Sequence, residues 1–243
     1  MDSTLYWLWL AEALGSGCRL AGRLLEEYPD PAELYGQVKA GWNPPEYLSA
    51  KAREFMQAVA PAQMAGLKKR CDDLNIFILT PDSADYPQRL RDLPDLPLVL
   101  YGTGNPACLN GRRYVGMVGT RRPTKYGLSA CRDLSLTMAE RGVVIVSGLA
   151  EGLDGAGHRA AVEAGQQTVA FLGTAINKTF PGWAWGLLPP GRRWGLSGYP
   201  SWSGAAWLQP GAELPLPPRG PMWRQQRGAR HWYCFLPPAA GPR

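Results

Sequence analysis

Two apolar runs, each ending in a glycine turn, constrain the fold of this chain more than any other feature. The first runs from Tyr114 to Gly119 and continues into Thr120-Arg121-Arg122, and the second runs from Val143 to Gly148. A β-rich run that passes through glycine into a helix start is how α/β proteins build anion sites, because backbone N–H groups point at the anion. Turns that follow adjacent parallel strands face one crevice. The sequence therefore predicts that function resides at these two turns.

Strands and helices alternate around the two turns. We expect helices over Tyr126–Arg141 and Gly155–Ala164 and a third strand over Thr168–Leu172. The predicted fold class is therefore α/β, with a Rossmann-like parallel sheet in residues 111–181 that is incomplete after Pro181. Four apolar residues are expected to form the buried side of the first helix: Leu128, Leu134, Leu136 and Met138.

Residues 1–74 have a helical period and predict a small all-α domain, of the SAM or helix-hairpin-helix-like type, before the sheet. The expected helices are Leu5–Leu14, Leu20–Leu25, Ala50–Ala60 and Gln63–Leu74. The turn between the first two fits a helix-hairpin-helix that contacts DNA or a plain αα-hairpin, and Arg19 as its only nearby basic residue favours the second. Residues 75–110 form a connector with short strands at 76–79 and 98–101.

The last segment, residues 182–243, differs in composition from the rest of the chain. It carries seven of the ten Trp and eleven of the 23 Pro, and it contains no Val, Ile, Lys, Asp, Asn or Thr. Proline at this density prevents long helices and central strands, so we expect a disordered tail. The tail holds seven Arg and one acid, so the whole net charge of +6 lies there and says little about the two turns.

Common catalytic and metal-binding patterns are absent from the sequence. The dinucleotide fingerprint and the P-loop pattern do not occur. Ser147, His158 and Asp154 are the residue types of a Ser-His-Asp catalytic triad. Nothing in the sequence resembles a nucleophile elbow, so we do not expect this activity. The five cysteines are far apart, which favours reduced thiols over disulfides or a zinc site. We expect no cofactor and no metal and, without an apolar run of membrane-spanning length or a signal sequence, no membrane partner and a cytoplasmic location.

Several segments, in order along the chain, resemble the DNA-processing protein A (DprA/Smf) family. The most specific are Val118-Gly119-Thr120-Arg121 and Ser147-Gly148-Leu149-Ala150-x-Gly152-Leu153-Asp154-x-x-x-His158, one at each turn. Each piece is weak alone, whereas the ordered set is specific and covers roughly Leu5 to Pro181. The supporting segments are Tyr126-Gly127, Tyr86-Pro87-x-x-Leu90, Pro97–Tyr101, Thr168–Gly173, Asn177 and Phe180-Pro181.

The resemblance implies a bacterial cytoplasmic protein that binds single-stranded DNA without sequence preference. It further implies help in loading the recombinase RecA during natural transformation and recombination, a role linked to competence. The resemblance also implies homodimers, an extended Rossmann-like fold, and no known catalytic reaction or metal. The physical chemistry agrees, because a basic crevice with backbone N–H groups suits successive phosphates of one strand.

The candidate DNA-binding residues all lie at the two turns. Arg121 ranks first, because the family's matching arginine contacts DNA and its guanidinium fork fits phosphate oxygens. Arg122 and Lys125 extend a basic rim or are merely solvated surface charges. The glycines serve tight turns as well as a ligand. The full set of expected DNA or phosphate contacts is Gly119, Thr120, Arg121, Arg122, Lys125, Ser147, Gly148 and Gly152.

Asp154 and His158 are expected to have structural roles beside this site. A carboxylate repels phosphate, so Asp154 is expected to cap the following helix. His158 lies one helical turn further on and is expected to pair with Asp154.

After Pro181 the chain departs from the family pattern. Leu196–Pro200 is a faint echo of the family's "SEYP" strand end, and its "RNR" motif is missing. The composition suggests G/C-rich codons read out of frame, so one hypothesis is a frameshifted end, and its rival is a basic aromatic tail that stacks on bases. Without the later strands the sheet keeps an unpaired edge, so we expect poor solubility or weakened DNA binding.

Two other classes of function compete with DNA binding. The first is a Rossmann-like enzyme acting on nucleoside monophosphates, although the P-G-G-x-G-T-x-x-E motif of such enzymes is absent from this sequence. The second is a structural or interaction protein, which rests on the helical N-terminal domain alone.

Overall fold

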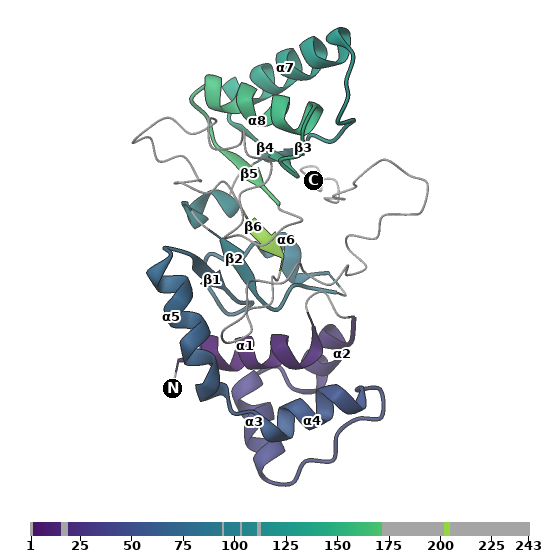
Figure 1. The fold of residues 1–243 in the computed structure, drawn as a ribbon, viewed down its shortest axis with the longest axis vertical. Helices are drawn as coiled ribbons and strands as arrows, with labels where there is room; N and C mark the ends of the chain where they lie inside the picture. Colours follow the sequence, from purple (N-terminus) through teal and green to yellow (C-terminus); the bar gives the residue numbers. More distant parts are fainter. Residues whose placement is uncertain are drawn as a thin grey trace, which may run out of the picture.

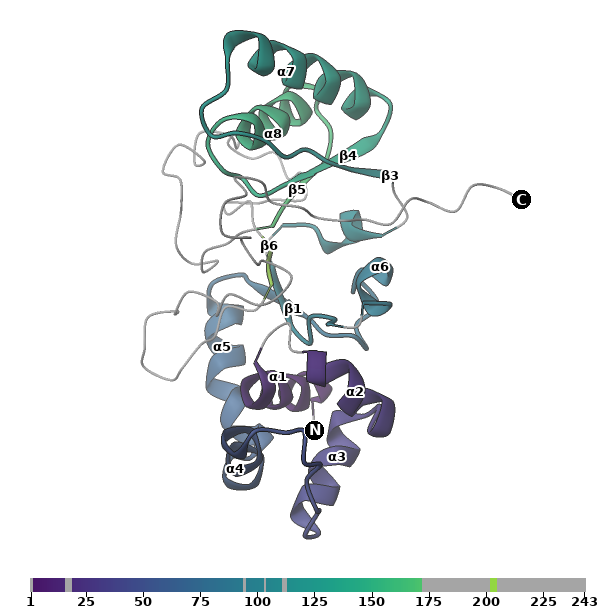
Figure 2. The same ribbon diagram turned by 90° about the vertical axis from the view of Figure 1, so that its right-hand side faces the viewer.

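The computed structural model of the chain describes residues 2–15, 19–93, 95–102, 104–110, 113–171 and 202–204 (Figures 1 and 2). Three parts follow one another along its long axis: a helical region at the N-terminus, a small antiparallel sheet, and a parallel sheet with two helices. None of the helices in the described residues is long and apolar enough to span a membrane.

The helical region is built from short capped helices around one apolar core. Asp30 is the N-cap of the third helix: its side chain accepts a hydrogen bond from the Ala32 N–H at 2.8 Å, and Pro31 is the first residue of the helix. The helix that begins here is not among those that the sequence predicts. The elements are α1 Ser3–Leu14, α2 Arg19–Glu27, α3 Pro31–Lys39, α4 Ala50–Ala58, the 3₁₀ helix η1 Pro61–Met64 and α5 Ala65–Asp73.

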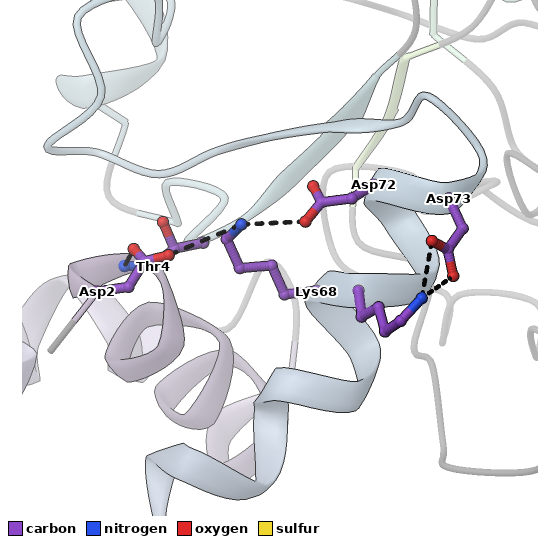
Figure 3. Close-up of polar contacts among 6 residues, drawn as sticks. Asp2, Thr4, Lys68, Asp72 and Asp73 are labelled. Atoms are coloured by element: carbon purple, nitrogen blue, oxygen red, sulfur yellow. Dashed lines mark hydrogen bonds and ion pairs between the residues drawn. The ribbon is translucent and has the colours of Figure 1, made fainter.

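The core of the helical region consists of large side chains. Trp9 and Leu10 of α1 are fully buried, and the Trp9 indole donates to the Val59 carbonyl at 2.9 Å. At the surface, the Lys68 ammonium lies 3.1 Å from Asp72 and 3.8 Å from Asp2, which links α5 to the start of α1 (Figure 3). Residues 16–18, at which the two hairpin interpretations differ, lie outside the described residues.

The connector strands β1 (Phe77–Leu79) and β2 (Leu100–Gly102) form an antiparallel sheet with β6 (Trp202–Gly204) of the last segment, in the order β1-β2-β6. Fully buried Tyr86 donates its hydroxyl to the Pro97 carbonyl at 2.6 Å, which joins two of the segments singled out in the sequence. Of residues 182–243 only β6 is described, and the predicted disorder, the frameshift hypothesis and its rival otherwise lie outside the described residues. The elements are β1 Phe77–Leu79, α6 Gln88–Arg91, β2 Leu100–Gly102, η2 Pro106–Leu109 and β6 Trp202–Gly204.

The predicted parallel sheet is confirmed. Its strands β3 Arg113–Gly116, β4 Val143–Ser147 and β5 Thr168–Ala170 lie in the order β3-β4-β5. The helices α7 Lys125–Glu140 and α8 Leu153–Glu163 cover one face (Figure 1). Alternate side chains of β4 point to opposite faces: Ile145 packs in the cluster with the helices, and Val144 and Val146 pack in the cluster with η2.

The predicted buried side of α7 is wrong. Leu128 is 37% exposed and Leu134 54% exposed, and Leu136 and Met138 are only half-buried. The buried residues are small ones, Cys131, Ser135 and Ala139, because α7 packs closely against α8. The spacing of the leucines indicated the wrong face of α7. Where two helices pack closely, small side chains fit between them better than the most hydrophobic ones.

Candidate functional site

The two glycine turns lie side by side at the carboxyl edge of the parallel sheet, as the sequence predicts. Three hydrogen bonds join them. The Met117 N–H donates to the Val146 carbonyl at 2.8 Å, the Ser147 hydroxyl donates to the Met117 carbonyl, and the Leu153 N–H donates to the Thr120 carbonyl at 3.2 Å. The turn after β3 and the turn after β4 therefore form one joined unit that runs into α8.

Asp154 sits between the turns and contacts both. One carboxylate oxygen accepts from the Gly119 N–H at 3.2 Å and the other accepts from the Gly148 N–H at 3.3 Å. The residue is 2% exposed. Burial raises the pKa of Asp154, and the hydrogen bonds from the turns oppose that rise. The predicted role as a helix cap is wrong, because Gly152 is the N-cap of α8 and has no side chain to act as a cap.

Gly152 is required by its backbone conformation and by its neighbours. Its φ is +88°, in the region that favours glycine, and a β-carbon there would lie 2.8 Å from the Arg121 α-carbon. Gly119 is similarly enclosed, since a β-carbon would lie 2.9 Å from that of Leu153. Both glycines therefore allow the two turns to approach each other more closely than any other residue would permit.

Leu149 is a site residue that sequence reasoning missed. Its φ is +55°, which is uncommon for a bulky residue, and its side chain is 3% exposed. The left-handed backbone turns the chain after Gly148 while the side chain stays inside. No residue pattern could have predicted this, because the conformation is imposed by the packing around the turn.

His158 contacts Thr168 instead of Asp154, so the predicted pairing is wrong. Its Nδ1 lies 2.7 Å from the Thr168 hydroxyl, which itself donates to the Ile145 carbonyl at 2.7 Å. This network assigns the proton to Nδ1. Burial lowers the pKa of His158 to about 4, so the ring is neutral at neutral pH. The histidine thus links α8 to the centre of the sheet.

The cationic residues form an exposed rim beside the joined turns. Thr120, Arg121, Arg122 and Lys125 are all exposed, and we call them the rim. The Thr120 hydroxyl accepts from the Arg122 N–H at 3.2 Å, which shapes the turn. Among the described residues none of the three rim cations has an ion-pair partner, so their charges are available to a ligand.

The remaining predicted contacts divide between surface and interior. Gly148 is exposed beside the rim, whereas Ser147 is 5% exposed and its hydroxyl is used within the protein. Gly119 and Gly152 are half-buried where the turns meet. The structure brings all the predicted residues together, but the side chains that face solvent are those of the rim.

This fold and site define an α/β protein with a joined pair of glycine turns and a basic rim at one edge of a parallel sheet. Residues 77–186 match the sequence profile of the family described as DNA recombination-mediator protein A. Through this segment the chain is similar to the DprA/Smf family.

Individual relatives show the same similarity. The chain is 37% identical over 99 residues to DNA processing protein DprA of Bacillus subtilis, covering 41% of this chain and 33% of the relative. It is 39% identical over 113 residues to protein Smf of Synechocystis, covering 44% of this chain and 28% of the relative. The chain thus spans about a third of the length of these relatives.

A solved structure shares the fold. The X-ray structure of DprA from Streptococcus pneumoniae superposes with a TM-score of 0.56 at 24% identity, covering 75% of this chain and 62% of that chain. At this identity the likeness concerns the fold alone.

Proposed function

We propose that this chain binds single-stranded DNA along the rim, without sequence preference. The observation that carries the proposal is a group of three exposed cations, two on the turn after β3 and Lys125 at the start of α7, with the exposed Gly148 turn beside it. None of the three has an ion-pair partner among the residues that the structure describes. Positive side chains that track phosphates supply most of the affinity for a single strand, and they do so for any sequence. The names of several relatives, which are called DNA processing proteins, support this reading.

Arg121 is the main contact in this proposal. Its guanidinium presents a planar fork that matches two phosphate oxygens, and its backbone lies on the turn beside Gly152. Arg122 and Lys125 extend the same surface toward the N-terminus of α7. The rest of the proposal follows the family resemblance: an intracellular protein that forms homodimers, takes no cofactor and assists the loading of RecA during recombination and transformation.

The competing proposal, an enzyme that acts on nucleoside monophosphates, finds less support at the described site. A general base must reach a substrate proton within hydrogen-bond distance. Asp154, between the turns, and His158, between α8 and the sheet, are 2% and 1% exposed, and each is engaged by protein groups. The groups that a ligand can touch here are the rim cations, exposed backbone and the Glu151 carboxylate, and the cations suit binding of a polyanion.

Fluorescence anisotropy with labelled oligo(dT) tests the proposal. Arg121→Ala is compared with Arg141→Ala, which removes the same exposed side chain at the opposite end of the 16-residue helix α7. We expect Arg121→Ala to weaken binding and Arg141→Ala to leave it nearly unchanged. Equal effects of the two variants, or no binding by the unaltered chain at low salt, would refute the proposal. Turnover of a nucleoside monophosphate would favour the enzyme.

A further inference from the structure

The joined turns already contain a negative charge in the place where a glycine-turn site would hold its anion. In such sites the N–H groups of the turn and of the helix N-terminus point at a phosphate. Here the N–H groups of Gly119 and Gly148, one from each turn, donate to the two oxygens of Asp154 at 3.2 and 3.3 Å.

The surroundings of Asp154 fit a bound anion. The residue lies in the first turn of α8, where the helix dipole stabilises negative charge. Its carboxylate is buried, and a β-carbon on Gly148 would lie 3.1 Å from one of its oxygens. The space between the turns is thus filled by this carboxylate and by the Leu153 side chain that crowds Gly119.

We infer that Asp154 is an internal anion that positions the two turns and excludes phosphate from between them. A free phosphate or a mononucleotide phosphate then finds no vacant N–H pair at Gly119 and Gly148. The phosphates of a DNA strand are restricted to the rim. The statement about DNA rests on the proposed function, whereas the statement about free phosphate does not.

The residue is therefore a positioning residue and a determinant of specificity. It disfavours the binding of a small anion between the turns, and it leaves the exposed cations to bind a polyanion. A phosphate that approaches this carboxylate meets a like charge, which disfavours its binding between the turns.

Amide NMR of the full chain tests this inference. Inorganic phosphate, and separately thymidine 5′-monophosphate, is added at millimolar concentration while the resonances of Gly119 and Gly148 are followed. We expect neither amide resonance to move in the unaltered protein. Saturable shifts of both resonances with inorganic phosphate would overturn the inference, because the N–H groups would then be free to bind it.

Variants separate positioning from a general loss of charge. Asp154→Asn keeps one acceptor oxygen, so at least one of the two glycine amides loses its partner and exchanges with solvent about tenfold faster. Glu151→Gln is the control, because it removes an exposed carboxylate from the same turn. Equal protection of both amides in Asp154→Asn and in Glu151→Gln would overturn the inference.

Binding of oligo(dT) completes the test. We expect Asp154→Asn to weaken binding about tenfold, although it removes a negative charge, because the rim loses its support. Tighter binding by Asp154→Asn would contradict the positioning role. If the unaltered chain binds no oligo(dT), the proposed function fails, and the phosphate titration still decides the role of Asp154.

Discussion

The helical region and the parallel-sheet unit are stabilised in different ways. The helical region has one core cluster rich in large apolar side chains, among them Trp9, Leu10 and Met56. The cluster under α7 and α8 centres on Ala139, Ile145 and Ala161. Buried polar side chains show the opposite distribution: Ser135, Ser147, Asp154, His158 and Thr168 belong to the parallel unit, and among the described residues only Thr80 lies elsewhere.

This difference follows from what each region must hold in place. Burial of apolar surface is strong but has no direction, and it suffices for helices that only have to pack. Hydrogen bonds have direction, so they can fix the two turns at the edge of the sheet. The parallel unit thus relies more on buried hydrogen bonds and less on apolar packing. We therefore expect its stability to depend on single residues at the turns.

The largest effect is expected from a matched pair of leucines. Leu10 is fully buried in the helical region and Leu134 is 54% exposed on α7. Leu10→Ala is expected to lower the free energy of unfolding by about 4 kcal/mol, and Leu134→Ala by less than about 0.5 kcal/mol. Urea unfolding measures both. A similar loss in the free energy of unfolding for both variants would contradict this expectation. It would indicate that the leucine side of α7 is buried, as the sequence predicts.

A matched pair of glycines tests the dependence of the parallel unit on its turns. Gly152→Ala meets the backbone of Thr120 and Arg121, whereas Gly165→Ala, at a φ of +69°, has no atom within 4 Å of the added carbon. We expect a loss of about 3 kcal/mol for Gly152→Ala and about 1 kcal/mol for Gly165→Ala, which suffers backbone strain alone. Equal losses would mean that the turns are not in close contact.

The two regions are expected to respond to pH in opposite directions. His158 has its pKa lowered from 6.5 to about 4 by burial, so the folded state binds fewer protons than the unfolded state between these values. Its unit should therefore lose about 2 kcal/mol between pH 7 and pH 5. Burial raises the pKa of Glu12 in α1 from 4.5 to about 7, so the stability contribution of Glu12 is lost as the pH rises through 7.

Local probes and two variants separate these contributions. Hydrogen exchange of amides in β4 and in α1 follows each region, and His158→Asn and Glu12→Gln should flatten the respective pH dependence. If both regions lose protection together as the pH falls from 7 to 5, the assignment of opposite signs is wrong.

Much of the fold could be predicted because its signals are local. The strands at 143–147 and 168–170 and the helices α7 and α8 follow from apolar runs and helical spacing, with ends displaced by only a few residues. Pro31 shows the limit of this approach, since the helix α3 that it opens is not among the helices that the sequence predicts.

The details of the site depended on contacts between distant segments. Asp154 meets Gly119, which is 35 residues away in sequence, and His158 meets Thr168 on the neighbouring strand. Spacing along a helix suggested a cap and a pair, but tertiary hydrogen bonds decided both partners. The positive φ of Leu149 has no sequence signal at all.

The central claim is that the rim contacts the DNA strand, and the salt dependence of binding tests it most directly. The affinity for oligo(dT) is measured over a series of salt concentrations for the unaltered chain, Arg121→Ala and Arg141→Ala. We expect Arg121→Ala to reduce affinity about tenfold and to lower the slope of log affinity against log salt by about one, and Arg141→Ala to keep the original slope. An unchanged slope in Arg121→Ala would contradict the account.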